Sequence, residues 1–531
     1  MPSPVTAHAF DFPHAGASKA GSFAPPLACK MLSLHLPGIS SSLADQRARL
    51  LEVVLVLAGG ISVALFILVP LSGLLVLVAC LAICFAALLG NVFRGRIDGI
   101  LLCWAAVFPL GYFFTSFPRE HAIVTLDRVV VLCAFLGLFL AKSASVTLVP
   151  RTLRNAGLAS LTFAVFAAFT LGKSPLPLNS ARALLDSYLI PFLLAWCVIW
   201  RFDVRRRLPA LHSAVCVSSI ISAVVAAAEI VAGQDLLPLG TSATVYAGIV
   251  RPNGPFESND SLALIGGVSL FFLLFLREAL GPGLSTGRKV LHSIGLAAAI
   301  SMALLPLFRS VAITLFLVLI IDTFWVRGTA RRSWHIALIL ASAGMIFTVA
   351  ALAPQVYEDR SGAGNIYGRV AEFEQSLHVF AEHPLFGVGF LNFHNYVAGE
   401  VRYVSTYEGV TSLDWPHDNL AEVLTETGIL GFLPYILAQI LLVKAMWELR
   451  RSSSSGRMVW KCFVYLFLTY WITGLSESSG YGPLNLWYLF VISVLCKYAL
   501  SEPDPLRVSE EHQSDEATVE SGPNLEPVFL R

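Results

Sequence analysis

Long runs of apolar residues, separated by short polar segments, occupy most of this 531-residue chain. Roughly 20 consecutive apolar residues are needed to cross the ~30 Å hydrocarbon core of a bilayer as a helix. On that basis we predict membrane helices at residues 51–69, 72–90, 98–117, 124–141, 155–172, 183–200, 210–233, 259–279, 289–307, 309–326, 333–352, 418–446, 458–475 and 483–500. Two of the runs are too long for one helix, and turns at Pro70 and Pro306 divide them. The pattern therefore predicts an all-α polytopic membrane protein with about 12–14 transmembrane helices.

The segments outside these runs define the rest of the organisation. Residues 1–45 are rich in Pro, Ser and Ala, and residues 501–531 are rich in Glu, Asp, Ser and Pro. Neither tail has much apolar surface to bury, and the first lacks the charged, apolar and cleavage regions of a signal peptide. We therefore expect disordered cytoplasmic tails on both sides of one membrane domain, residues 46–500.

The only substantial loop between predicted helices is 353–417, and loops of this length are usually functional or disordered. Within residues 369–382 four apolar side chains recur at helical spacing: Val370, Phe373, Leu377 and Phe380. This spacing predicts an amphipathic helix that either lies on the membrane or caps a cavity. His383 and Pro384 are expected to end it.

Lys and Arg are concentrated in alternate connecting segments, and this alternation orients the predicted helices. Cytoplasmic loops of membrane proteins carry an excess of basic residues. With the N-terminus inside, roughly 27 of the 36 Lys and Arg fall on the cytoplasmic side, and loop 353–417 is periplasmic. Only 13% of the residues are charged, against about 25% in soluble domains. No basic domain stands outside the membrane loops, which disfavours nucleic acid as a partner.

Several ionisable residues are predicted on the outward face, beside this loop: Arg251, Arg309, Arg369 and His417. Each alone has a structural interpretation, because arginines near a membrane often pair with lipid phosphate and a histidine at a helix start can bond the backbone. The glycines at 387 and 389 are likewise interpreted as a structural turn, since a lone Gly-x-Gly is a weak phosphate motif. The convergence of four such residues on one face favours a functional site.

The start of the predicted helix 418–446 is unusually polar. Asp414 is a reasonable N-cap, and Pro416 suits a first helical turn. Asp418, Glu422 and Glu426 then recur every four residues and form an acidic stripe on one helix face. Ionisable groups that enter a membrane helix are costly, so we expect this stripe to face a polar cavity or a partner.

Four segments, in order between about residues 245 and 435, resemble the O-antigen ligase and Wzy-type O-antigen polymerase superfamily of envelope glycosyltransferases. They are Arg251-Pro252-Asn253-Gly254-Pro255-Phe256 with Asn259; Phe308-Arg309-Ser310; His383-Pro384-Leu385-Phe386-Gly387-Val388-Gly389 with Phe393; and His417 with Glu422, Glu426, Gly428 and Gly431. The chain differs from the family pattern at Asp418, where Asn, Ser or Gln is usual, and at Ala421, where Leu is usual.

The resemblance implies a bacterial inner-membrane glycosyltransferase that works at the periplasmic face in cell-surface polysaccharide synthesis. Such enzymes pass a glycan from an undecaprenyl-diphosphate donor to an acceptor hydroxyl, on lipid A–core for a ligase or on another lipid-linked glycan for a polymerase. The partners expected are therefore this donor, a glycan or lipid A–core acceptor, and membrane lipids.

On this reading His417, Arg251 and Arg309 are the expected catalytic residues, and Arg369, Asn259 and Glu422 are expected to bind substrate. Guanidinium groups can stabilise a departing diphosphate, and an imidazole can take a proton from a hydroxyl. The outward loops contain no Asp-x-Asp and no His/Glu pair with metal-ligand spacing, so we expect no metal and no cofactor.

Two alternatives stay open. A transporter or flippase of lipid-linked sugars is the first, but it is expected to show charges or broken helices near mid-span, whereas these polar residues cluster outward. A protein O-oligosaccharyltransferase, which shares the same signature, is the second.

Overall fold

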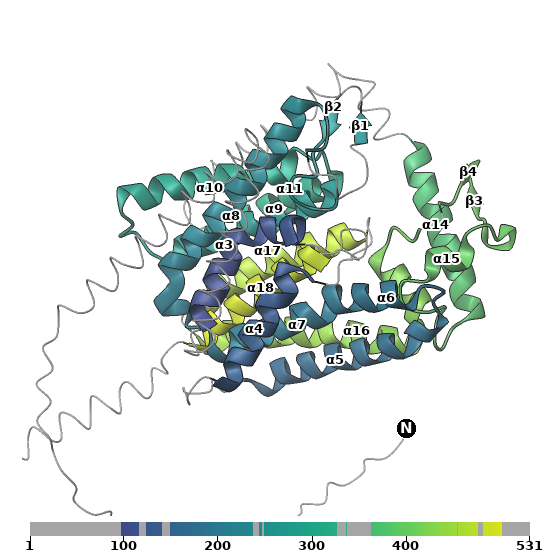
Figure 1. Ribbon diagram of the computed structural model, residues 1–531, viewed down its shortest axis with the longest axis horizontal. Helices are drawn as coiled ribbons and strands as arrows, with labels where there is room; N and C mark the ends of the chain where they lie inside the picture. Colours follow the sequence, from purple (N-terminus) through teal and green to yellow (C-terminus); the bar gives the residue numbers. More distant parts are fainter. Residues whose placement is uncertain are drawn as a thin grey trace, which may run out of the picture. The chain divides into compact units, whose positions relative to one another are not determined.

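The computed structural model describes residues 97–115, 124–140, 149–236, 244–246, 249–325, 336, 363–413, 415–453, 455–475 and 482–501. The predicted spans 51–69 and 72–90, nearly all of 333–352 and most of both tails lie outside the described residues. Helices dominate what is described (Figure 1). Two small antiparallel hairpins accompany them, β1 (Thr244–Tyr246) with β2 (Ile249–Arg251), and β3 (Thr406–Tyr407) with β4 (Val410–Thr411).

Each predicted span that falls within the described residues coincides with a helix. In chain order the helices are α3 (Ile97–Thr115), α4 (Leu126–Leu140), α5 (Arg151–Thr170) continued by a 3₁₀ turn η1 (Leu171–Lys173), α6 (Pro177–Leu184), a π-helical turn η2 (Leu185–Leu189), α7 (Ile190–Arg201), α8 (Val204–Ala232), α9 (Asn259–Ala279), α10 (Thr286–Leu304), α11 (Arg309–Trp325), α16 (Asn419–Ser452), α17 (Gly456–Gly474) and α18 (Gly482–Leu500). The predicted break near Pro306 is confirmed, since α10 ends before it and α11 begins after it.

Five helical segments of the described chain are long and apolar enough to cross a membrane: Arg151–Lys173, Pro177–Arg201, Val204–Ala232, Asn259–Ala279 and Asn419–Arg451. Shorter apolar helices at Ile97–Gly111 and Leu484–Leu500 accompany them. The predicted all-α polytopic class is thereby confirmed.

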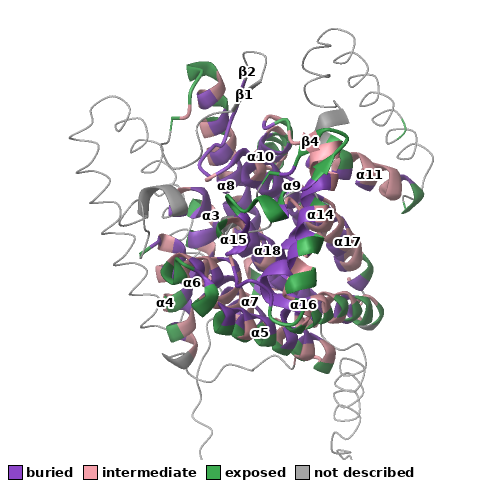
Figure 2. Ribbon diagram, turned by 90° about the vertical axis from the view of Figure 1, so that its right-hand side faces the viewer, coloured by how far each residue is buried: buried purple, intermediate pink, exposed green. Residues whose placement is uncertain are grey.

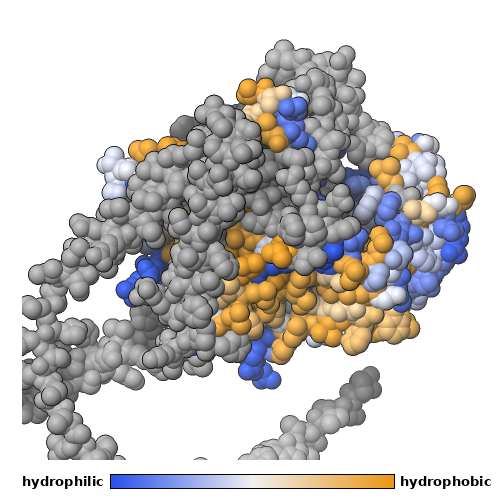
Figure 3. Space-filling view, in the orientation of Figure 1, coloured by the Kyte–Doolittle hydropathy of each residue, from blue (hydrophilic) through white to orange (hydrophobic). Residues whose placement is uncertain are grey.

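The centre of the helix bundle is formed by α9 and α18, which are mostly buried (Figure 2). Helix α9 packs against α8, α10, α17 and α18, and the rings of Trp104, Phe108 and Trp487 stack within the same core. Helices α5 and α16 lie side by side and expose leucine, valine and phenylalanine on their outer faces (Figure 3). Apolar outer faces of this kind are expected where hydrocarbon is the solvent.

A partly buried ion pair stabilises the π-helical turn η2, which interrupts the span predicted at 183–200. The Arg128 guanidinium donates to both carboxylate oxygens of Asp186, at 2.7 and 2.6 Å. A two-pronged pair of this geometry is among the stronger polar contacts in proteins. It joins the start of α4 to the irregular turn, where the helical ladder is least regular.

The loop between α11 and α16 contains the predicted amphipathic helix, α14 (Ala363–Glu382), which begins earlier than expected and ends where expected. A short helix α15 (Phe393–Val397), a 3₁₀ turn η3 (Val401–Tyr403) and the β3–β4 hairpin follow it. Val379, Val388, Phe393, Val397 and Tyr403 form the small core of this segment, which we call the loop lobe (residues 363–413).

Candidate active site

The loop that follows α14 crosses α16 at a break in that helix. Gly428 has φ 64° and ψ −174°, so the helical ladder stops there. The freed backbone groups of α16 bond the loop instead: Val388 N donates to Thr425 O at 3.0 Å, and Ile429 N donates to Pro384 O at 2.8 Å. The two most specific parts of the sequence signature, His-Pro-Leu-x-Gly-x-Gly and the glycines of α16, are therefore two halves of one crossing.

Glycine is required at this crossing because the two backbones nearly touch. A Cβ on Gly387 would lie 2.3 Å from the backbone of Glu426, and a Cβ on Gly428 would lie 2.4 Å from that of Leu385. Both glycines also have φ near +60°, where other residues are strained. The interpretation of Gly387 as structural therefore fits its surroundings.

Glu426 is bonded to the loop backbone. Its buried carboxylate accepts hydrogen bonds from Leu391 N at 2.7 Å and from Phe393 N at 3.2 Å. The lowest member of the predicted acidic stripe thus faces a backbone partner, and it positions the residues that lead into α15.

Helix α16 begins at Asn419, with Asp418 as its N-cap. The Asp418 carboxylate accepts hydrogen bonds from Leu420 N at 2.7 Å and Ala421 N at 3.3 Å. The expectation of a first turn at Pro416 is wrong, because the cap lies two residues later; Asp414 lies outside the described residues. Asn and Ser are also strong N-caps, so the family's usual residues at this position can do what Asp418 does here. Burial raises the pKa of Asp418, although its backbone hydrogen bonds oppose the shift.

His417, just before this cap, faces a buried carboxylate from α14. Its Nε2 lies 3.9 Å from Oε1 of Glu372, and the other carboxylate oxygen, Oε2, lies 3.4 Å from Nη1 of Arg369. The Glu372 side chain is only 4% exposed, so its charge acts in a poorly solvated place. The structure therefore brings two predicted site residues, His417 and Arg369, together through a third.

Glu372 was not predicted from the sequence. The same helix carries two further acidic residues, Glu374 and Glu382, and spacing alone does not say which of the three is buried. Its position three residues after Arg369 was the only available signal. Burial against α16 distinguishes it in the structure.

Arg251 and Arg309 belong to a second cluster, around α9 and α11. The buried Arg251 donates from Nε to Pro306 O at 2.7 Å and lies 3.7 Å, at Nη2, from Asp260 Oδ1. It thereby ties the end of β2 to the turn that precedes α11. Arg309 is the first residue of α11 and is exposed.

The two remaining predicted site residues lie in the first turns of α9 and α16. Asn259 is buried at the first position of α9, and its Oδ1 makes no hydrogen bond within the described residues. Glu422 is buried in the first turn of α16, one turn after Asp418. Within the described part of the chain, no three His, Cys, Asp or Glu side chains are grouped to hold a metal ion.

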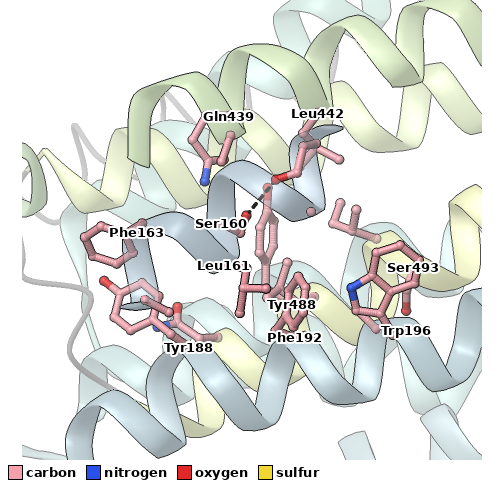
Figure 4. Close-up of a pocket in the computed structure, with 18 of the residues that line it drawn as sticks. Ser160, Leu161, Phe163, Tyr188, Phe192, Trp196, Gln439, Leu442, Tyr488 and Ser493 are labelled. Carbon is pink, nitrogen blue, oxygen red and sulfur yellow. Dashed lines mark hydrogen bonds between the residues drawn. The ribbon is translucent and has the colours of Figure 1, made fainter. Parts of the chain in front are cut away.

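A cavity of about 150 Å³ lies between α5, α7, α16 and α18 (Figure 4). Its lining is mainly aromatic and aliphatic, with Phe163, Tyr188 and Trp196 among the side chains that face it. The Ser160 hydroxyl beside it donates to the carbonyl of Ala156 in its own helix. Such a lining suits a hydrocarbon chain better than a sugar.

These features define a class, an all-α polytopic membrane protein in which a buried carboxylate of the loop lobe faces a histidine just before a broken helix. Residues 260–436 match the family model described as O-Antigen ligase. The predicted resemblance to the O-antigen ligase and Wzy-type superfamily is thus confirmed for the segment that carries Arg309, Arg369 and His417, while Arg251 lies just before it. No curated protein matched the chain.

Proposed function

We propose that this protein transfers a glycan from an undecaprenyl-diphosphate donor to an acceptor hydroxyl at the periplasmic face of the bacterial inner membrane, as an O-antigen ligase or polymerase. The observation that carries the proposal is the pairing of His417 with the buried Glu372 inside the matched segment. A carboxylate beside an imidazole orients the ring and stabilises its protonated form, which is what a general base needs.

In this mechanism His417 takes the proton of the acceptor hydroxyl as the oxygen attacks the anomeric carbon of the donor glycan. The bond between that carbon and the diphosphate oxygen breaks, and undecaprenyl diphosphate leaves with the electron pair. With Nε2 directed at Glu372, the other ring nitrogen, Nδ1, would receive the proton. Glu372 stays ionised and balances the charge of the imidazolium.

The arginines would stabilise the leaving group. Arg309 is exposed at the start of α11, where a diphosphate can reach it. Arg251 is buried and hydrogen-bonded to the turn before Arg309. It therefore helps to position that turn and adds positive charge near Arg309. A departing diphosphate gains negative charge, which fixed guanidinium groups stabilise strongly. Arg369, Asn259 and Glu422 are proposed to bind the sugars or the acceptor.

A purified system tests the proposal directly. Wild-type protein in lipid nanodiscs, given a lipid-linked glycan donor and an acceptor, should transfer the glycan. His417→Ala should lower the rate by about 10²–10⁴-fold, the usual contribution of a general base, while donor binding persists. Trp415→Ala is the matched control. Trp415 lies two residues before His417, its ring stacks on that of His394, and it has no assigned chemical role.

The outcome also separates the alternatives. A wild-type protein that translocates the lipid-linked donor across vesicles without transferring the glycan would be a transporter, and the proposal would be wrong. Transfer to a protein hydroxyl, with none to lipid A–core or to a second lipid-linked glycan, would identify a protein O-oligosaccharyltransferase. Equal losses in the His417 and Trp415 variants would mean that this helix start is needed for structure only.

A further inference from the structure

Helix α14 is packed with its polar side inward. The residues buried against the rest of the protein are Ala371, Glu372, Gln375, Ser376 and Val379. The apolar stripe predicted from the sequence lies mainly outside this contact: Phe373 is 48% exposed and Leu377 43% exposed. Ile366 lies about one helical turn before the first member of the stripe, Val370, and is exposed as well. In water a helix buries its apolar face against the protein. Because this stripe is not buried in that way, we expect it to contact something other than water.

The exposed stripe continues into the outer surface of the membrane helices. Directly after α14, Leu385 and Phe386 are exposed, and the Phe386 ring stacks on Phe166 of α5 at 5.9 Å. Phe169, one turn further along α5, is 81% exposed. In Figure 1, α14 runs across the direction of α5 and α16 and lies at the end where α16 begins. An amphipathic helix oriented in this way matches one that lies in the plane of a bilayer surface.

The end of α5 marks where this span leaves the hydrocarbon. The helix tightens into η1 at Leu171–Lys173, and the Lys173 ammonium donates to Gly387 O at 2.7 Å, close to the Phe386 ring. Lysine side chains near a span end usually place their charge at the interface. The loop that begins where α14 ends therefore lies at the level of the headgroups.

We propose that α14 is an interfacial helix whose Ile366–Phe373–Leu377 stripe is embedded in the lipid leaflet at this end of the spans. The occupant of the exposed face is the acyl-chain and headgroup boundary of the bilayer, about 5–10 Å deep for helices of this kind. The opposite side of α14 carries Glu372 toward His417. Helix α14 then separates the lipid from the candidate site. If the proposed function holds, a lipid-linked donor reaches that site from the leaflet, past α14.

Photo-crosslinking tests the lipid contact without an activity assay. A benzophenone amino acid is placed at Phe373, at Leu377 or at His378, and the protein is reconstituted in nanodiscs of phosphatidylethanolamine and phosphatidylglycerol. His378 is the matched control because it is also exposed but lies about 100° around the helix from Leu377. After illumination, intact-mass spectrometry should show single-phospholipid adducts at positions 373 and 377, and several-fold fewer at 378.

Every other result contradicts the proposal. Crosslinks from 373 and 377 to the protein itself or to a second copy would show a protein occupant. Equal amounts of lipid adduct at all three positions would show that the whole helix is surrounded by lipid. The absence of lipid adducts at all three would show that the apolar stripe faces water. Because no glycan transfer is measured, failure here leaves the proposed function standing. Conversely, if wild-type protein transferred no glycan, the proposed contact between α14 and lipid would be unaffected.

Discussion

Glu372 has the most consequential position of any single side chain in the described chain. It is buried, and its two oxygens face a histidine and an arginine that both lie in the matched family segment. A buried carboxylate is costly unless cations or donors compensate it. Its placement between His417 and Arg369 therefore makes their mutual arrangement rigid, as a catalytic base requires.

Replacing Glu372 by Gln should lower glycan transfer at neutral pH by at least about tenfold, because the protonated imidazole loses its counter-charge. The acid limb of the pH–rate profile should move to lower pH, since a less stabilised imidazolium gives up its proton more readily. The measurement is the rate in nanodiscs between pH 5 and 9. Glu374→Gln on the same helix is the control. An unchanged profile in the Glu372 variant would exclude the pairing from the mechanism.

Asp418 should influence stability in a pH-dependent way. Its pKa is raised by burial from the ordinary 3.8, so the ionised carboxyl is the less favourable form in the folded protein. Stability from this group is therefore complete below pH 3.8 and is lost as pH rises through the raised pKa. Asp418→Asn keeps the cap and should melt at or above the wild-type temperature at pH 7, with the gap closing in acid. Asp418→Ala should cost about 1 kcal/mol in acid and less at pH 7.

Replacing Arg251 and replacing Arg309 should have different effects on the stability of the protein. Arg309→Ala should abolish transfer with a normal melting temperature, because this side chain is exposed at a helix start. Arg251→Ala should also lose about 1.5–3 kcal/mol of stability, since the charged hydrogen bond to Pro306 O is removed. Lysine should rescue neither well, because it lacks the planar two-pronged donor. Normal transfer by Arg309→Ala would mean that Arg309 does not stabilise the leaving diphosphate.

At the scale of elements, the crossing of the loop over α16 holds the loop lobe to the membrane helices. Backbone hydrogen bonds run in both directions across it, and Glu426 and Lys173 add side-chain bonds to the same loop. A helix broken at Gly428 leaves unsatisfied backbone groups, which within a membrane protein must be bonded internally. The loop supplies those partners. The crossing is therefore a structural requirement of the broken helix.

Alanine at Gly387 or Gly428 should prevent this crossing. The added Cβ meets backbone at 2.3 or 2.4 Å, and neither backbone can move without breaking the hydrogen bonds. Steric overlap costs about 1–3 kcal/mol and the left-handed conformation about 1–2 more, so the melting temperature and the yield of folded protein should both fall. Gly399→Ala is the control, because it has φ +78° with open space around it. Equal effects at Gly399 and Gly387 would show that only the backbone conformation matters.

At the scale of the whole molecule, orientation in the membrane decides whether the site can meet its proposed substrates. The alternation of basic loops predicts residues 353–417 outside and 201–208 and 447–457 in the cytoplasm. In the structure, Arg206 and Arg457 are exposed beside the ends of α8 and α17, and Glu408 is exposed in the loop lobe. These positions give direct reporters of the two sides.

A membrane-impermeant maleimide added to spheroplasts should label Glu408→Cys, and should label Arg206→Cys and Arg457→Cys only after lysis. Reactivity is compared with the parent protein, in which Cys197, Cys216, Cys462 and Cys496 are buried. Labelling of Glu408→Cys only after lysis would reverse the orientation and contradict the periplasmic reaction.

The sequence by itself determined where the described helices lie and which family the chain resembles. Apolar run length is a local property, so the span predicted at 259–279 coincides with α9, and the break near Pro306 follows from the proline itself. The glycine and histidine signature gave the resemblance that the match at residues 260–436 confirms, because each of its segments is short and contiguous. The apolar stripe of α14 could also be predicted, because it follows from the spacing of residues within one helix, and that helix is present in the structure.

Only the tertiary structure decided which groups face each other. Sequence spacing did not reveal that the polar side of α14 is the buried one, because the lipid-exposed and protein-exposed faces of such a helix look alike in periodicity. It did not select Glu372 among the three acidic residues of one helix, nor place the cap of α16 at Asp418. The burial of Glu372 depends on contacts between segments far apart in sequence, such as the one between Glu372 and His417, 45 residues apart. Such contacts are formed by packing and not by local pattern.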